Sequence, residues 1–277
     1  RALFIALVLI VLAPIRSYAQ PGADEQLAAQ YFQNGDYERA ILYYEKLFRK
    51  QPTTFYYEQL YKSYVGLNDL ESAQKLVKDQ MKHNKDDPRY PVDMGLIFRK
   101  MGDDPKAEKE FDKALRMMGD QQGSVRQVAN YFTSANEYDL ALQAYERGQR
   151  SLGDGQNFYY EMANLYAAMG DVQKMVSAYM EMLAVNEAYL QQIQNSLSRY
   201  MDFEVSDDRT NILRTELLRR IQRDPQRTVY QELLIWMYIQ QNDLTAAFVQ
   251  SKAMDKRFDE GGMRLMDLAR IALANKD

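Results

Sequence analysis

Few side chains in this sequence belong to the types that carry out chemistry. The chain has no cysteine, which excludes disulfides, thiolate zinc sites and cysteine nucleophiles. His83 is its single histidine, so a site with several histidine ligands cannot form. Its position at the expected end of a helix suits a favourable contact with the helix dipole. We therefore expect no catalytic role for this histidine.

Three pairs of adjacent aspartates could supply oxygen ligands to a cation, at residues 86–87, 103–104 and 207–208. Each pair stands where a helix is expected to begin, and Asp at that position caps free backbone amides. The alternating pattern of a calcium loop is missing. The loop Gly153-Asp154-Gly155 follows no strand, so it predicts a linker rather than a phosphate cradle. We expect neither metal nor cofactor, and no enzyme within these residues.

A short motif recurs along the chain and defines the elements that position every other side chain. It is first seen as Asn34-Gly35-Asp36-Tyr37-Glu38-Arg39-Ala40. The positions equivalent to residue 40 are 73, 107, 141 and 175, at separations of 33, 34, 34 and 34. A further copy ends at residue 247, beyond one longer and degenerate repeat. Regular spacing of this kind indicates an array of repeated structural elements.

Each repeat has the pattern of two amphipathic helices joined by a tight turn. In the first repeat, Ala28 is small enough to let another helix approach closely. Gly35 tolerates the positive φ of a turn, and Asp36 is placed to cap the second helix. Pro52 marks that helix's end. The inward positions of the two helices are Leu27, Tyr31, Ala40, Ile41, Tyr44 and Leu47.

This pattern resembles the tetratricopeptide repeat, in which a large residue, Leu-Gly/Ala, Tyr, a Gly-Asp turn, Ala, an aromatic residue and Pro stand at fixed offsets. The third repeat matches at Met94, Gly95, Phe98, Gly102, Ala107 and Phe111. Two departures stand out: Met175 replaces the small Ala, and Trp is absent from its usual place, with Trp236 elsewhere. The resemblance implies an all-α, right-handed superhelical solenoid of antiparallel helix pairs.

The repeat register divides the chain into a leader and an array. Residues 1–19 have the short apolar run and small residues of a signal peptide cleaved before Gln20, and the run is too short for the alternative, a membrane anchor. The array over residues 20–277 is expected to consist of repeats at about 21–54, 55–87, 88–121, 122–155, 156–189, a degenerate 190–227, 228–261, and 262–277. The last segment is either a capping helix or the start of a further repeat.

The first helices of such repeats line the concave side, where members of the family hold their partners. The residues expected in this groove are Lys62, Arg99, Arg126, Asn130, Tyr160, Asn164 and Trp236. Asn130 and Asn164 are 34 residues apart, so they stack and could bond the backbone of an extended peptide. The alternative is that they are merely solvated. The negative charge of Glu161 would repel the terminal carboxylate of a bound peptide, so we do not expect the clamp by which some family members bind such a carboxylate.

A row of arginines in the degenerate repeat offers a second surface. Arg219, Arg223 and Arg227 recur every fourth residue, as on one stripe of a helix. This stripe is either a solvated outer face or a basic patch for an acidic partner or anionic lipid, through which the protein would associate peripherally with a membrane. The net charge of −4 excludes general attraction for nucleic acid.

These observations predict a non-enzymatic scaffold that binds other proteins or peptide segments through its concave face. The leader predicts export, to the periplasm or the outer membrane. The resemblance to exported bacterial repeat proteins suggests a role in envelope assembly or secretion. The alternative is that the array is the N-terminal docking or sensory arm of a larger protein that continues past residue 277.

Overall fold

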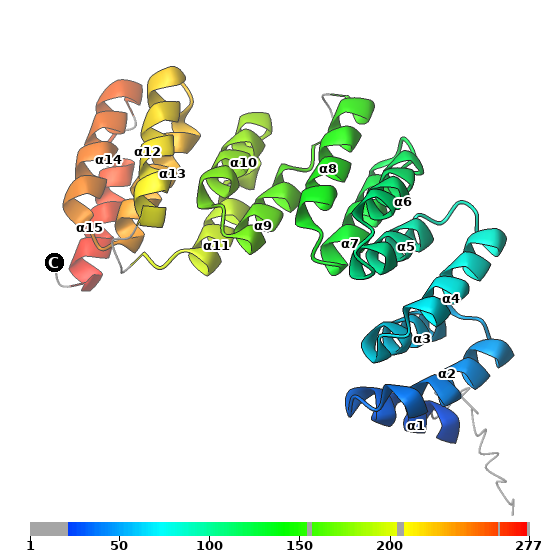
Figure 1. Ribbon diagram of the computed structural model, residues 1–277. Coiled ribbons are helices and arrows are strands. Elements are labelled where there is room, and N and C mark those ends of the chain that lie inside the picture. Colours follow the sequence, from blue (N-terminus) through cyan, green and yellow to red (C-terminus); the bar gives the residue numbers. More distant parts are fainter. Residues whose placement is uncertain (1–21, 154–156, 204–207, 260, 276–277) are drawn as a thin grey trace, which may run out of the picture. The chain divides into compact units, whose positions relative to one another are not determined.

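The computed structural model describes residues 22–153, 157–203, 208–259 and 261–275 of the 277-residue chain. All regular secondary structure in those residues is helical (Figure 1). The expected signal peptide at residues 1–19 and most of the loop 153–155 lie outside the described residues. The chain divides into two compact parts, here called the N-terminal body, ending at Glu110, and the C-terminal body, beginning at Phe111.

The N-terminal body contains α1 to α5 and most of α6. Their bounds are α1 (Ala23–Gln33), α2 (Tyr37–Lys50), α3 (Thr54–Leu67), α4 (Leu70–His83), α5 (Arg89–Lys100) and α6 (Asp104–Arg116). From α1 to α5, each helix packs on the next one in sequence.

The C-terminal body contains the remaining helices. Their bounds are α7 (Gln122–Ser134), α8 (Tyr138–Leu152), α9 (Tyr159–Met169), α10 (Val172–Val185), the 3₁₀ turn η1 (Glu187–Tyr189), α11 (Leu190–Tyr200), α12 (Asp208–Arg223), α13 (Thr228–Gln240), α14 (Leu244–Phe258) and α15 (Met263–Asn275). The prediction of an all-α chain of helix pairs joined by short turns is confirmed.

The turn inside each regular pair is nearly the same each time. One residue adopts positive φ, and it is either Gly or Asn: Gly35, Asn68, Gly102, Asn136, Gly170 and Asn242. The N–H of the following residue donates to an aromatic residue's carbonyl five positions back, at 2.9 Å in all six turns. Gly and Asn are the residues that enter the left-handed region most easily, so these turns reverse the chain at little cost.

An aspartate after the turn then starts the second helix. The side chain of Asp36 accepts the N–H of Arg39 at 3.3 Å, and Asp171 accepts that of Lys174 at 3.0 Å. Asp69, Asp103 and Asp243 cap their helices in the same way. Such a cap contributes about 1 kcal/mol. The predicted turn and cap of the repeat are therefore both confirmed.

Small residues let the helices of each body approach closely. Ala28, Ala40 and Ala73 are completely buried in the N-terminal body, among tyrosines such as Tyr57. In the C-terminal body Met175, which replaces the expected small residue, is also buried. No single helix pair covers its own apolar side, so stability comes from packing of successive pairs.

The degenerate repeat departs from this plan. Its first helix, α11, follows the turn η1, and its second helix, α12, packs on α10 and α13. α12 ends at Arg223, and Arg227 stands after a turn, as the residue before α13. The predicted stripe of Arg219, Arg223 and Arg227 is therefore wrong as one helical face, because the helix stops between the last two.

The last described helix leaves apolar side chains in solvent. Leu268 is buried against α14, whereas Met263, Met266 and Leu273 are 70%, 59% and 78% exposed. None of the helices in the described part of the chain is both long and apolar enough to cross a membrane.

Candidate functional site

In the N-terminal body, the first helices α1, α3 and α5 are joined to one another by polar contacts. The hydroxyl of Tyr56 donates to Glu25, and Arg89 forms an ion pair with Glu58 at 3.0 Å. The hydroxyl of Tyr57 donates to Asp93 Oδ2 at 2.6 Å. Each of these side chains already has a partner within the protein. This set of contacts, here called the ladder, therefore serves mainly to join α1, α3 and α5.

Asp93 is a strongly perturbed carboxyl group in this ladder. Its removal from water raises its pKa to about 7, although the hydrogen bond from Tyr57 and the charge of Arg89 act in the opposite direction. The hydroxyl of Tyr61 donates to the Asp93 carbonyl at 3.3 Å. The same burial raises the pKa of Tyr57 well above its ordinary value.

The two groove residues predicted in this body have different surroundings. Lys62 is exposed on α3. Arg99 is half-buried, and its guanidinium pairs with Glu108 of α6 at 2.8 Å, so it is turned toward the second helix of its own repeat. Lys62 is therefore the more accessible of the two cations.

In the C-terminal body, Arg126 is occupied by the protein itself. Its Nε donates to Glu161 of α9 at 2.7 Å, and its Nη1 donates to Gln122 at 2.9 Å. The guanidinium also lies 5.3 Å from the ring centre of Phe158. Arg126 thus joins α7 to α9 and neutralises Glu161, while Asn130 stays exposed on α7.

Tyr160 and Asn164 lie in a polar cluster that continues onto α11. We name the α9–α11 cluster for its five residues: Tyr160, Asn164, Gln192, Ser196 and Arg199. Hydrogen bonding with Ser196 has the largest effect on the pKa of the Tyr160 hydroxyl. Gln192, Arg199 and Asn164 also hydrogen-bond with this hydroxyl. Together they outweigh burial and lower the Tyr160 pKa from its ordinary value.

Several contacts orient the members of the cluster. Asn164 Oδ1 accepts the hydroxyl of Tyr179 at 3.5 Å. Arg199 donates to the Asn195 carbonyl at 3.3 Å and to Ser196 Oγ at 3.5 Å. The cluster has one cation, Arg199, and no carboxylate. The Ser196 hydroxyl is buried and donates to the Gln192 carbonyl at 3.0 Å, whereas the exposed Gln192 and Arg199 can donate to acceptors such as peptide carbonyls or a carboxylate.

Trp236 belongs to the packing of the body. It is half-buried, and its ring meets Phe203 edge to face, with centres 5.2 Å apart. The ring also packs against the core that contains Leu197 and Leu233. Trp236 therefore packs as a core residue at the edge of the body.

Three of the five cluster residues were missed at the sequence level. Gln192, Ser196 and Arg199 lie in the stretch where the repeat register is lost, because η1 and a turnless connection replace the usual spacing. The signal that could have found them is their spacing of four and three residues, which places them on one face of a helix. Ser196 is buried together with Ile193 and Leu197, whereas Gln192 and Arg199 are exposed.

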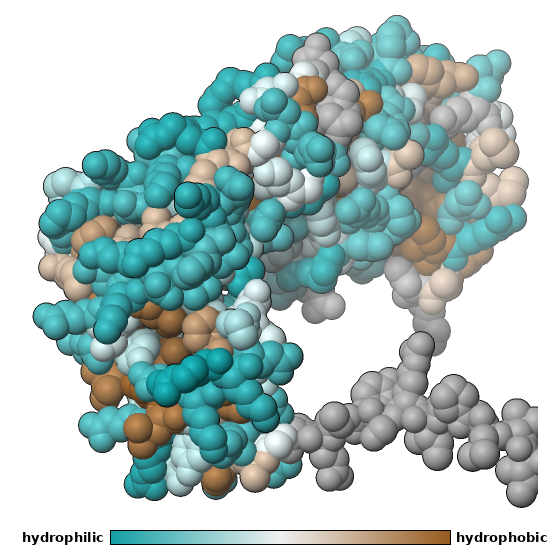
Figure 2. Space-filling view, turned by 90° about the vertical axis from the view of Figure 1, so that its right-hand side faces the viewer, coloured by the Kyte–Doolittle hydropathy of each residue, from teal (hydrophilic) through white to brown (hydrophobic). Residues whose placement is uncertain are grey.

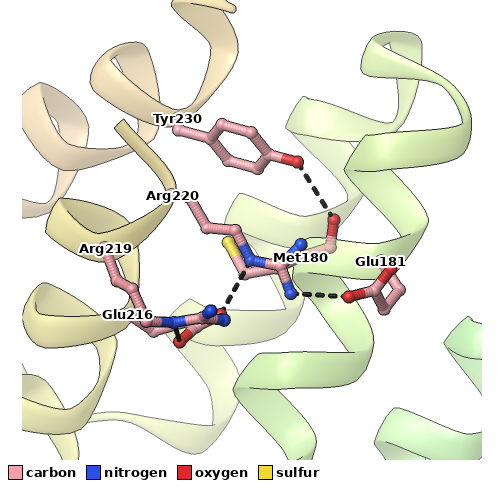
Figure 3. Close-up of polar contacts among 6 residues, drawn as sticks. All are labelled: Met180, Glu181, Glu216, Arg219, Arg220 and Tyr230. Atoms are coloured by element: carbon pink, nitrogen blue, oxygen red, sulfur yellow. Dashed lines mark hydrogen bonds and ion pairs between the residues drawn. The ribbon is translucent and has the colours of Figure 1, made fainter. Parts of the chain in front are cut away.

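A buried ion network was also missed (Figure 3). Arg220 is buried, and its guanidinium donates to Glu216 at 2.8 Å and to Glu181 of α10 at 2.6 Å. Arg219 donates to the same Glu216 at 2.7 Å. Arg227 pairs with Glu187 at 2.8 Å and donates to the Ala184 carbonyl. The arginine row is therefore partly structural, because it connects α12 and the start of α13 to α10 and η1.

Two segments of the sequence match the family model of the tetratricopeptide repeat, residues 26–53 and 157–189. These two segments are tetratricopeptide-like repeats. The first matched segment spans most of α1 and all of α2, and the second spans α9, α10 and η1. Both fall within repeats expected from the 34-residue register, at 21–54 and 156–189.

Solved structures of low identity cover most of the chain. One is the C-terminal part of a tetratricopeptide-repeat protein from Cytophaga hutchinsonii, with 18% identity, 87% of this chain and 97% of that chain covered, and a TM-score of 0.32. Another is a tetratricopeptide-repeat protein from Parabacteroides merdae, with 12% identity, 90% and 98% covered, and a TM-score of 0.34. No curated protein matches the sequence.

The described residues bring together no group of three acidic or histidine side chains suited to a metal ion. His83 is exposed as the last residue of α4, as the sequence predicts. Asp87 and Asp103 bond to backbone amides at the starts of α5 and α6. The side chains of the α9–α11 cluster can form hydrogen bonds with a bound molecule.

Proposed function

We propose that this protein is a non-enzymatic scaffold that binds a segment of another protein at the α9–α11 cluster. The observation that carries the proposal is that polar side chains of two first helices, α9 and α11, meet around Tyr160, with one cation and no carboxylate among them. An extended peptide presents carbonyl oxygens that such donors recognise. The neighbouring Arg126–Glu161 pair is internally neutral, so it does not repel an acidic segment.

We further propose that the scaffold acts outside the cytoplasm, in the periplasm or at the outer membrane, in envelope assembly or secretion. The support for export is the signal-like sequence of residues 1–19. The second candidate is a docking or sensory arm of a larger protein, which uses the same binding surface. In the first case the protein is a separate scaffold, and in the second it is one part of a larger protein. The partner is bound in the same way in both.

The test compares two doubly substituted proteins by crosslinking mass spectrometry in the native envelope fraction. One is Asn164→Ala with Arg199→Ala, which removes donors from the cluster. The matched control is Gln191→Ala with Ser198→Ala, two exposed positions on α11 outside the cluster. We expect crosslinks between α9 or α11 and a partner protein to disappear in the first protein and persist in the control. Crosslinks that persist in both would reject the cluster as the binding site.

A further inference from the structure

A groove on the second helices of the N-terminal body is separate from the proposed binding site. It lies between α2 and α4, has a volume of about 1050 Å³, and is floored in part by Leu60 and Tyr64 of α3. Phe48 of α2 and Leu76 of α4 line it and are only half-buried. Figure 2 shows apolar surface between polar side chains in the lower part of the view, which α1 to α4 occupy.

The charged residues around the groove are not balanced. The lining holds four cationic side chains, Arg49, Lys75, Lys78 and Lys82, against three carboxylates, Glu45, Glu71 and Asp79. Of the lining cations, Arg49 and Lys75 are exposed, and the structure pairs neither with a carboxylate within the described ranges. Negative charge on an occupant would therefore meet a small excess of positive charge, with an exposed cation on each wall.

The shape of the groove favours a helix as its occupant. Its walls are two helices of 14 residues, each about 21 Å long. The backbone groups of such walls are used within the helices, so they offer no hydrogen bonds to an extended strand. A helix needs none, because its own backbone groups are satisfied, and an apolar stripe can cover Phe48 and Leu76.

We infer that the α2–α4 groove docks an amphipathic helix of a partner protein, with its apolar stripe on Phe48 and Leu76 and acidic residues facing Arg49 and Lys75. This surface lies on helices other than those of the α9–α11 cluster, so the two sites can be tested separately. A scaffold with both would hold two partners, or two parts of one partner.

The test uses a pair of synthetic fluorescent peptides of the same helical length and the same Leu and Phe stripe. One carries Glu on both flanks of the stripe and the other carries Lys. We expect the Glu peptide to bind saturably by fluorescence anisotropy, and the Lys peptide to bind at least tenfold more weakly. Substitution Lys75→Glu with Arg49→Glu should weaken the Glu peptide about tenfold and strengthen the Lys peptide.

The control is Lys109→Glu with Lys113→Glu, which reverses two exposed charges on α6, outside the groove. Equal binding of the two peptides, or equal loss in the control, would overturn the inference. The Asn164→Ala, Arg199→Ala protein should bind the Glu peptide normally. Self-association of the unmodified chain in sedimentation, removed by Leu76→Lys and competing with the Glu peptide, would instead make a second copy the occupant.

Discussion

Removal of the Arg220 side chain should destabilise the C-terminal body by several kcal/mol. Arg220 and Glu216 are 8% and 6% exposed at their side chains, and the guanidinium also reaches Glu181 on α10. Loss of one partner from a buried ion pair typically costs 3–5 kcal/mol, because the remaining charge stays desolvated. Arg219 still contacts Glu216, so we expect about 3 kcal/mol for Arg220→Met, at the lower end of that range.

The pH dependence of this loss identifies its cause. Burial would raise the Glu216 pKa, but hydrogen bonds from Arg219 and Arg220 hold it below its ordinary value. A lowered carboxyl pKa stabilises the folded state above the unfolded pKa, and this stabilisation is lost as the pH falls. Without Arg220 the Glu216 pKa rises and the carboxyl accepts a proton more easily. The difference between wild type and Arg220→Met should therefore shrink from pH 7.5 to pH 4.5.

Urea unfolding followed by Trp236 fluorescence measures this difference in the right body, since Trp236 packs on Phe203 there. Arg219→Met is the matched control, with a side chain 53% exposed and an expected loss below about 1 kcal/mol. The double change Glu216→Leu with Arg220→Met removes both buried charges and should recover most of the stability. A loss below about 1 kcal/mol for Arg220→Met, or one independent of pH, would refute the reasoning.

Three further predictions concern single groups in the two bodies. The free energy of unfolding of Asp93→Asn, relative to wild type, should increase as the pH rises from about 4 toward 7 and change little above that, because the raised pKa of Asp93 makes its ionisation in the folded state unfavourable. Urea unfolding of both proteins at several pH values across that range checks this, and a difference that does not depend on pH would contradict it. Gly148→Ala should lower the melting temperature, since the added Cβ would lie 2.6 Å from Val125 Cγ1, whereas Gly123→Ala, with nothing within 4 Å, should not. Asp171→Ala should cost about 1 kcal/mol by urea unfolding through loss of the cap on α10, and an unchanged midpoint would argue against that cap.

The sequence by itself determined the repeated helix pairs. Local rules suffice there: Gly or Asn permits the positive φ of the turn, Asp caps the next helix, and a small residue such as Ala40 permits close packing. These signals recur at a fixed spacing, so each copy supports the others. The end of α1 and the start of α2 follow from them.

Only the tertiary structure decided which of the predicted binding residues have partners within the protein. Arg99 and Arg126 read alike as exposed groove cations, but each is held by a carboxylate, Glu108 or Glu161, that lies on a different helix. The sequence could not supply these pairs because they depend on how neighbouring helices face each other. Tyr160 gained its partners on α11, and Asn164 gained Tyr179 on α10, for the same reason.

The arginine row shows the same division between local and tertiary information. A spacing of four residues predicted one stripe, but the helix ends at Arg223, and burial of Arg220 depends on α10. Helix propensity and charge spacing are local properties, so the sequence determined the helices and their turns. Pairing and burial are properties of packed surfaces, so only the tertiary structure decided which charges hold the fold together and which remain available to a partner.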